Sequence, residues 1–576
     1  MMTQIKLEFL PNEILFQCFN YLNIIDIYYS FDQLNHRFNS LIRTIPFDLN
    51  FTNIKNKYQC DEFCQKLSTD ETIQNQLYSL YLSNENTCYP IHLFLSKCSL
   101  LQFPHLHSLT LHKIRQNSWK SIRSVLSLIP KLSSFQMIDF RILLDVEFSV
   151  LPILQLNTLI IPAQPLPGSI FDIEFSCIMH LSINSCKLND LLILFKNAPK
   201  LNHFKTDYLR TNNTDVTTNI SDYINSHANN LKTLHIHHID CSVSNLFTLL
   251  KRTPNLKNLI LLESSDVNII NANAWQTLIT SSLSHLKNFK FNFYVDVFPH
   301  PNLINEQNFK EFRNDFWCKE HYWHTEYTIR SSSASIYTIP HPCDSFGFHH
   351  CGQRYHSEAI THTHTFNSVK DLLLRPEDLT ENNEYYFANI DLLSLGEPYI
   401  YQNEYIEINY SHLKHLQTMV NLSHIKHLIL LSNLKFETSN ILKEIVKSTT
   451  QLTSLSIDYS LLQPCLNDDE LCNYLNRTIK KLNIRDDPLK ISDQLKHFCK
   501  VFSNLEQLKY DTNESNILFL TKHLLKLKYM EIQVFLSSNQ RYWINEEVEK
   551  LPIDTTIDFK DHGNNFFSLF IWIYRK

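Results

Sequence analysis

Cysteine and histidine side chains, which bind zinc as thiolate and imidazole, gather between residues 298 and 368. The candidate ligands are Cys343, His349, His350, Cys351, His356, His362 and His364. A zinc finger needs two ligand pairs at a fixed separation, and no Cys-x-x-Cys or His-x₃₋₅-His pair is matched by a second one here. A chain with 28 histidines also brings some of them together by chance. We therefore predict no metal site and no cofactor, and interpret this segment as an elaborated repeat or a loop packed over the edge of the fold.

The usual catalytic motifs are missing from the sequence. The chain has only 5 glycines, and the close pair Gly347 and Gly352 is not followed by the Lys-Ser/Thr of a phosphate-binding loop. There is no Gly-x-Ser-x-Gly, no His-Glu-x-x-His and no catalytic cysteine signature. Acidic runs such as Asp468-Asp469-Glu470 are typical of helix caps and solvated turns. We expect a protein that is not an enzyme.

The composition indicates a folded chain without a basic surface. Hydrophobic residues make up 43% and charged residues 19% of the 576 positions, which is enough to bury a continuous core. The net charge of −6 comes from interspersed signs, so we expect no nucleic-acid partner. The 14 cysteines lack paired spacing, and residues 1–9 lack a secretion signal, which favours a cytoplasmic or nuclear location with reduced thiols.

The apolar run from Phe566 to Tyr574 is much shorter than the roughly 20 residues that span a bilayer. We predict a final core strand there and no membrane association.

The first fifty residues predict three short helices. Pro11 suits a first helical turn, and apolar residues follow it at helical spacing up to Leu22. Asn23 is placed to cap a second helix from Ile24 to about Phe31, and Asn35 to start a third. A unit of this size holds little core by itself, so its apolar residues indicate that it binds a partner.

These helices resemble the F-box. The opening Leu-Pro-x-Glu-Ile-Leu of that family is present as Leu10 to Leu15, whereas the third helix has Asn35-His36-Arg37-Phe38 where the family usually has a Cys-Lys/Arg-x-Trp-like sequence. The resemblance covers about residues 7–47 and implies docking to a Skp-type adaptor, and through it to a cullin in a ubiquitin ligase. The residues it assigns to adaptor binding are Leu10, Pro11, Ile14, Leu15, Phe19, Leu22, Ile27, Leu34 and Phe38.

Beyond residue 75 the pattern Leu-x-x-Leu-x-Leu, with Ile, Phe or Met substituting, recurs every 22–30 residues or so. It starts at Leu77, Leu106, Leu132, Leu156, Ile178, Leu201, Leu231, Leu256 and Leu286, and resumes at Val369, Ile390, Ile425, Leu452, Ile479, Leu505 and Leu527. Proline stands two residues before the first leucine four times, at Pro104, Pro130, Pro199 and Pro254. Apolar residues at helical spacing follow the strands, so the repeat is predicted to be strand, turn, helix, turn.

This pattern resembles the leucine-rich repeat, whose units stack into a curved solenoid with a concave strand face. The residue between the two inward-facing positions of each strand should point to that face. We expect a substrate-binding row there, of mixed charge, that suits a protein partner. Its members are Tyr81, Thr110, Gln136, Ile160, Ser182, Lys205, His235, Ile260, Lys290, Ile429, Ser456, Asn483, Lys509 and Glu531.

The expected fold class is α/β, with a three-helix F-box domain at 1–48 followed by a leucine-rich repeat solenoid. The solenoid is expected in two parts, 49–297 and 369–576, separated by an irregular insertion at 298–368. Together the two resemblances imply the substrate-recognition subunit of an SCF-type ubiquitin ligase, which binds an unknown protein substrate through the repeats. The alternative is a leucine-rich repeat interaction scaffold without ligase function.

Overall fold

The structure is a computed structural model, and the part of the chain that it describes comes in short ranges. These are residues 7–52, 57–85, 90–139, 151–162, 171, 173–211, 227–264, 266–296, 306–329, 333–348, 353–355, 365–380, 385–396, 406–431, 434–485, 492–511, 515–535, 554–561 and 566–574. The chain divides into two compact units, Met1–Tyr322 and Trp323–Lys576, and each is described by itself. The domain boundaries expected at residues 48, 297 and 368 stay predictions.

The first unit begins with the predicted helices. They are α1 (Asn12–Phe19), α2 (Ile24–Phe31) and α3 (His36–Ile42), and a 3-10 turn at Leu7–Phe9 precedes them. Asn23 Oδ1 accepts from the backbone N–H of Ile25 at 3.0 Å, so the predicted cap of the second helix is confirmed. Asn35 Oδ1 caps α3 in the same way, through the N–H of Phe38 at 3.0 Å. Strand β1 (Phe47–Asn50) and helices α4 (Lys57–Thr69) and α5 (Glu71–Gln76) follow.

After these helices, the first unit consists of a parallel sheet and the helices that connect its strands. After β1 its strands are β2 (Leu77–Ser83), β3 (Ser108–His112), β4 (Ser134–Ile138), β5 (Thr158–Ile161), β6 (His180–Lys187), β7 (His203–Arg210), β8 (Thr233–Asp240), β9 (Asn258–Leu261) and β10 (Asn288–Asp296). Each strand pairs in parallel with the next along the chain. Parallel neighbours need a crossover between them, and helices occupy several of these crossovers.

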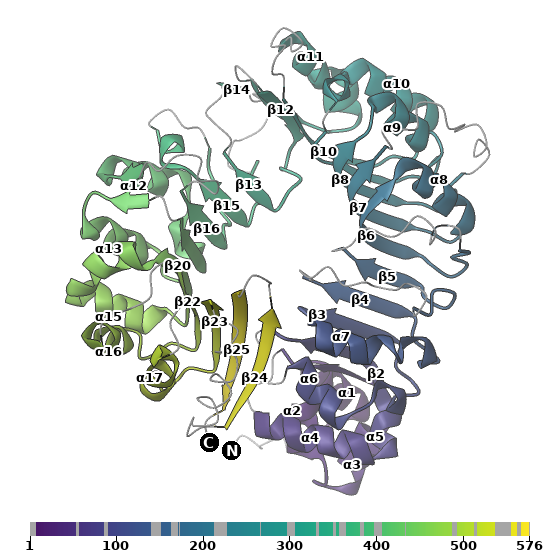
Figure 1. Ribbon diagram of the computed structural model, residues 1–576. Coiled ribbons are helices and arrows are strands. Elements are labelled where there is room, and N and C mark those ends of the chain that lie inside the picture. Colours follow the sequence, from purple (N-terminus) through teal and green to yellow (C-terminus); the bar gives the residue numbers. More distant parts are fainter. Residues whose placement is uncertain are drawn as a thin grey trace, which may run out of the picture. The chain divides into compact units, whose positions relative to one another are not determined.

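The crossover helices of this unit are α6 (Ile91–Lys97), α7 (Gln116–Arg123), α8 (Leu188–Asn197), α9 (Val243–Leu250) and α10 (Ala272–Ser282), and α11 (Glu306–Lys310) follows the last strand. Figure 1 shows α8, α9 and α10 along one side of strands β6 to β10. The leucines that start the predicted repeats in this unit are all at most 5% exposed, because they fill the layer between strands and helices.

The second unit opens with antiparallel pairing. Strand β11 (Thr325–Ile329) pairs with β12 (Ser333–Thr338) and β14 (Gln353–Tyr355). Apolar and polar residues alternate from Ala334 to Ile339, which is typical of a strand, and β12 covers most of this run. A parallel series then follows in the order β13 (Ser345–Gly347), β15 (Asp371–Leu374), β16 (Leu392–Leu395), β18 (His427–Leu430), β20 (Ser454–Asp458), β21 (Lys481–Arg485), β22 (Gln507–Asp511) and β23 (Tyr529–Phe535).

The carboxyl-terminal strands end that sheet in an antiparallel manner. Strand β25 (Phe566–Tyr574) lies between β23 and β24 (Asp554–Asp561) and pairs antiparallel with both, so the predicted final strand is confirmed. A separate pair joins β17 (Ile406–Ile408) and β19 (Leu434–Phe436). The helices are α12 (Tyr410–Met419), α13 (Ser439–Ser448), α14 (Tyr459–Leu462), α15 (Asp469–Thr478), α16 (Ser492–Val501) and α17 (Ser515–His523).

The chain therefore has a mixed α/β fold with large parallel sheets. Val369 and Ile390, the first two repeat starts expected in the second unit, are both fully buried before β15 and β16. Among the described helices, none combines the length and the apolar character that crossing a membrane requires.

Candidate functional site

Four of the predicted adaptor residues lie inside the core of α1 to α3. Leu15, Phe19, Ile27 and Phe38 are all buried. The ring of Phe31 lies between those of Phe19 and Phe38, at centroid distances of 5.2 and 5.4 Å. The F-box resemblance assigns Leu15 to adaptor binding, but its side chain is buried in the core of the three helices and is not on their surface. These four residues therefore support the surface from inside and are not themselves part of it.

Other predicted residues remain on the surface. Ile14, Leu22 and Leu34 are 40%, 44% and 54% exposed, Pro11 is exposed as well, and Leu10 is half-buried. Phe9 and Tyr21, which the sequence did not single out, are 77% and 89% exposed. Apolar side chains that are exposed in this way gain free energy when a partner covers them. We call Phe9, Pro11, Ile14, Tyr21, Leu22 and Leu34 the module surface.

Arg37 ties the start of α1 to α3. Its Nε donates to Asn12 Oδ1 at 2.9 Å, and its guanidinium also donates to the carbonyl oxygens of Glu8 and Leu10. A planar guanidinium with several donors suits such a multiple contact. The unusual third-helix sequence thus holds the segment that carries Phe9 and Pro11 in place, a role that sequence spacing could not predict.

Ion pairs and hydrogen bonds with residues after position 48 attach the three helices to α4 and α5. The Asp32 carboxylate, whose side chain is only 4% exposed, lies 3.0 Å from Arg43 Nη2 and 3.1 Å from Lys66 Nζ. Gln76 donates to the carbonyl oxygens of Ile42 and Ile45 at 2.6 and 2.8 Å and accepts from the Tyr28 hydroxyl at 3.1 Å. Burial raises the pKa of Tyr28 to about 12. Because these ion pairs and hydrogen bonds join α2 and α3 to α4 and α5, the module surface sits on a fixed support.

The predicted row of the first unit forms one continuous line across the sheet. Strand pairing places each member opposite the next, in the order Tyr81, Thr110, Gln136, Ile160, Ser182, Lys205, His235, Ile260 and Lys290. Thr110 and Ser182 are buried, Lys290 is exposed and the others are half-buried. The alternation that puts the flanking apolar residues in the core brings this row to one face.

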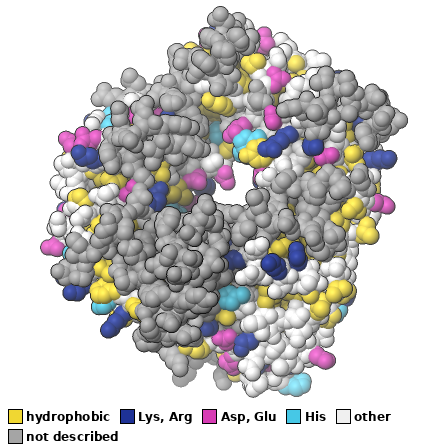
Figure 2. Space-filling model, viewed as in Figure 1, with side chains coloured by type: hydrophobic (Ala, Val, Ile, Leu, Met, Phe, Trp, Pro, Cys, Tyr) yellow, Lys and Arg dark blue, Asp and Glu magenta, His cyan; other side chains and the backbone are white. Residues whose placement is uncertain are grey.

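In the second unit the remaining members also pair in order. Ile429 lies opposite Ser456, and Asn483, Lys509 and Glu531 follow. Asn483 Nδ2 donates to Ser456 Oγ at 3.0 Å, and Lys509 Nζ lies 2.9 Å from Glu531 Oε1. The register is observed, whereas substrate binding by either row stays a prediction. Figure 2 shows acidic, basic and histidine side chains interspersed on the visible face, which agrees with the interspersed charges of the sequence.

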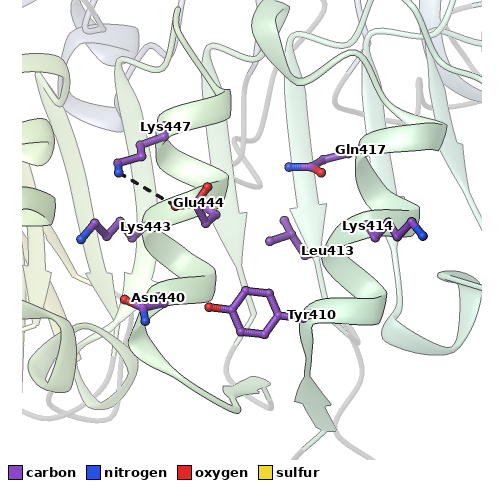
Figure 3. Close-up of a pocket in the computed structure, with 8 residues that line it drawn as sticks. All are labelled: Tyr410, Leu413, Lys414, Gln417, Asn440, Lys443, Glu444 and Lys447. Atoms are coloured by element: carbon purple, nitrogen blue, oxygen red, sulfur yellow. Dashed lines mark ion pairs between the residues drawn. The ribbon is translucent and has the colours of Figure 1, made fainter.

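Helices α12 and α13 border a polar groove of about 550 Å³ (Figure 3). Its lining residues are Tyr410, Leu413, Lys414, Gln417, Asn440, Lys443, Glu444 and Lys447. Lys443 Nζ lies 2.6 Å from Glu470 and 3.0 Å from Asp468, and these bonds raise the pKa of Lys443 to about 12. Lys447 Nζ also pairs with Glu470, at 2.7 Å. Since carboxylates of the chain already neutralise two of its lysines, the groove is a poor anion site.

Of the seven candidate zinc ligands named from the sequence, the structure describes only Cys343. His349, His350, Cys351, His356, His362 and His364 lie outside the described residues. Cys343 is described and half-buried, and its backbone N–H donates to His341 Nδ1 at 3.3 Å. The His341 ring is 2% exposed and packs beside Tyr337 and Phe366. Burial lowers its pKa to about 4.

The buried His341 makes the stability of the second unit depend on pH. In the unfolded chain it titrates near 6.5, so between pH 6.5 and 4 the unfolded chain holds a proton that the folded chain lacks. Stability is therefore lost as the pH falls through this window, by about 2 kcal/mol between pH 7 and 5. Urea unfolding of wild type and His341→Gln at both pH values measures this. Equal pH dependence of the two proteins would contradict the assignment.

Comparisons with known proteins give little to add to this geometry. No family model matches the chain, and no curated protein does. The solved structure of the Rad7 and Elc1 complex in yeast is 11% identical over 87% of this chain and 92% of that chain, with a TM-score of 0.28. The Toll–Spatzle complex of Drosophila is 11% identical over 77% of this chain and 48% of that chain, with a TM-score of 0.21. Because both TM-scores are so low, the proposals below rest on the residues of the chain itself.

Proposed function

We propose that this chain is the substrate-recognition subunit of an SCF-type ubiquitin ligase, with an F-box module at its start and leucine-rich repeats behind it. The observation that carries the proposal is the module surface. Four of its residues, Pro11, Ile14, Leu22 and Leu34, belong to the set that the F-box resemblance assigns to the adaptor. Pro11 is exposed, and the other three are 40–54% exposed. Such apolar groups gain free energy when a partner covers them, about 25 cal/mol for each Å² removed from water.

In this proposal the repeats supply the second binding surface of the chain, for the substrate. The row from Tyr81 to Lys290 combines aromatic, aliphatic, amide, hydroxyl and cationic groups on one line of neighbouring strands. Interfaces between proteins have this mixed character, with apolar contacts at the centre and polar groups around them. In this proposal the row captures a protein, and the chain itself carries out no catalysis, which belongs to other subunits of the ligase.

Reconstitution with purified components tests the proposal and separates it from a scaffold role. The full chain, immobilised by a tag, is mixed with a cullin in the presence and absence of the Skp-type adaptor. The proposal expects the cullin to be retained only when the adaptor is present. Retention of the adaptor without the cullin would favour a scaffold that borrows the adaptor. Failure to retain the adaptor would contradict the ligase proposal and leave the repeat scaffold.

A further inference from the structure

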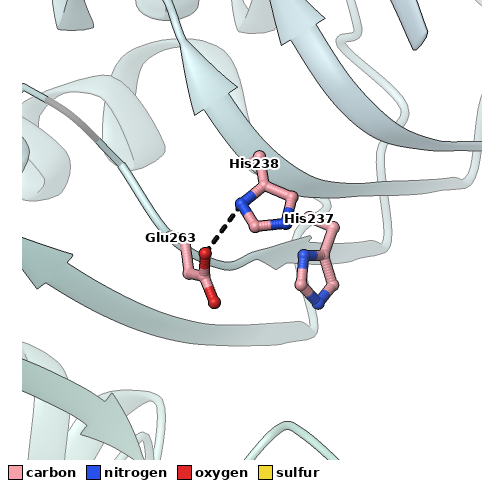
Figure 4. Close-up of side chains that lie close together, drawn as sticks. All are labelled: His237, His238 and Glu263. Carbon is pink, nitrogen blue, oxygen red and sulfur yellow. Dashed lines mark ion pairs between the residues drawn. The ribbon is translucent and has the colours of Figure 1, made fainter. Parts of the chain in front are cut away.

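His237 and His238 lie side by side on β8, with Glu263 close to them just after β9 (Figure 4). Consecutive residues of a regular strand point to opposite faces. Here the pairing of β7 with β8 runs through Thr206 opposite Ile236, omits the next position and resumes with Tyr208 opposite His238. The ladder is interrupted at this omitted position, and both imidazoles are half-buried, with ring centroids 4.4 Å apart.

The three side chains offer one ligand atom each within a small volume. His238 Nδ1 lies 2.7 Å from Glu263 Oε2, and the three ligand atoms lie within 4.8 Å of one another. Around a tetrahedral zinc ion with bonds of about 2.0–2.2 Å, ligand atoms are separated by about 3.3–3.6 Å. Small rotations of the His237 and Glu263 side chains therefore suffice to bring all three into bonding distance of one ion.

Neighbouring groups hold the His238 ring and the backbone of Glu263 in position. The His238 ring stacks on that of Tyr208 at 4.5 Å with an interplanar angle of 9°, and the Arg210 guanidinium carbon lies 5.0 Å from the centre of the Tyr208 ring. The backbone carbonyl of Glu263 accepts from the Ile239 N–H at 2.8 Å. A site whose ligands are fixed before binding loses less free energy in ordering them.

A second cluster in the same unit shows why the first is the better cation site. Glu85, His112 and Asp139 also lie within 4.8 Å. However, Lys113 Nζ lies 2.6 Å from Glu85 and 3.1 Å from Asp139, so an ammonium group already neutralises both carboxylates. Glu263 instead pairs with an imidazole, and a metal ion can take the place of the imidazole proton.

We propose that His237, His238 and Glu263 form a zinc site on the strand face, beside the predicted row residue His235. Two imidazoles and one carboxylate are a common set of three protein ligands for zinc, and the fourth position is then open to water. The Glu263 side chain is 48% exposed and that of His238 31%, so an ion has access from solvent. This inference does not depend on the proposed ligase function, because it concerns ligands of the chain alone.

Zinc titration of the full chain tests the site. Protein stripped with a chelator is titrated with ZnCl₂ against a chromophoric chelator, and wild type is compared with His238→Gln and with Glu263→Gln. Each substitution should remove one bound equivalent or weaken its binding at least 10-fold, since a ligand is lost. His112→Gln, in the cluster that Lys113 neutralises, serves as the matched control and should leave the titration unchanged.

Cobalt(II) provides a second readout, and the comparison with the site variants assigns its signal to this cluster. The wild type should develop the visible absorption of tetrahedral cobalt, and both site variants should lose that signal while their urea midpoints stay close to wild type. Equal zinc stoichiometry and affinity in wild type and in both site variants would overturn the proposal. So would an equal loss in His112→Gln.

Discussion

Replacing Glu326 with glutamine should lower the free energy of unfolding of the second unit by about 3–5 kcal/mol, because it removes one partner of a buried ion pair. Glu326 Oε2 lies 2.6 Å from Arg354 Nη2, and the two side chains are 2% and 4% exposed. The Tyr337 hydroxyl donates to Glu326 Oε2 at 3.2 Å and the Thr365 hydroxyl to Oε1 at 3.1 Å. Without the carboxylate charge, the guanidinium stays buried without its anion.

The surroundings of Arg354 explain why the loss should be large. Its guanidinium carbon lies 4.6 Å from the ring centre of Tyr385 and 5.3 Å from that of Phe366, so aromatic rings take the place of water around it. Cation–π contacts contribute about 1–2 kcal/mol at such sites, which is less than the cost of an uncompensated buried charge. The aromatic rings therefore cannot replace the carboxylate.

An exposed ion pair of the same unit provides the control for this prediction. Lys426 Nζ lies 2.8 Å from Asp391 Oδ1, but the two side chains are 50% and 40% exposed. Asp391→Asn should therefore cost at most about 1 kcal/mol. Urea unfolding of the two variants and wild type measures the difference. Similar midpoints for Glu326→Gln and Asp391→Asn would show that burial of the first pair has no energetic consequence.

Placing acidic charges on the module surface should abolish adaptor binding without unfolding the helices. The double variant Leu22→Asp and Leu34→Asp changes two side chains that are 44% and 54% exposed. We expect the dissociation constant for a Skp-type adaptor to rise at least 100-fold, which corresponds to about 3 kcal/mol, because a charge in an apolar contact loses its hydration. Surface plasmon resonance with immobilised adaptor measures this change.

Two leucines elsewhere in the first unit, which are somewhat more exposed, supply the control. Leu128 and Leu154 are 61% and 64% exposed, and both lie outside the three helices. The double variant Leu128→Asp and Leu154→Asp carries the same added charge and should bind the adaptor as wild type does. If both double variants lose binding equally, general charge rather than the module surface explains the loss.

Repetition made the strand row predictable from sequence. Most of these strands have two inward apolar residues separated by one residue, as in Leu109 and Leu111, and the residue between them must then face the other way. Helix caps were equally predictable, because Asn23 and Asn35 precede apolar runs. These features depend on near neighbours in the chain, which is why single-sequence patterns find them.

Contacts between residues far apart in the chain could not be predicted from the sequence. Nothing in the sequence pairs Glu326 with Arg354, or Glu263 with His238, because only the folded sheets bring them together. Helical spacing also did not distinguish the buried Leu15 from the exposed Leu22, because the spacing predicted one helix up to Leu22, whereas α1 ends at Phe19 and Leu22 lies beyond it. Arg37 was visible only as a departure from a family pattern, although it holds the start of α1.

Hydrogen exchange of the full chain with and without a Skp-type adaptor tests the central claim most directly. The proposal expects slower exchange in peptides within residues 7–42, where α1 to α3 carry the module surface, and unchanged exchange in strands β2 to β10 of the first unit. Adaptor at saturating concentration with no protection in residues 7–42, or with protection confined to the strands, would contradict the claim that these helices bind the adaptor.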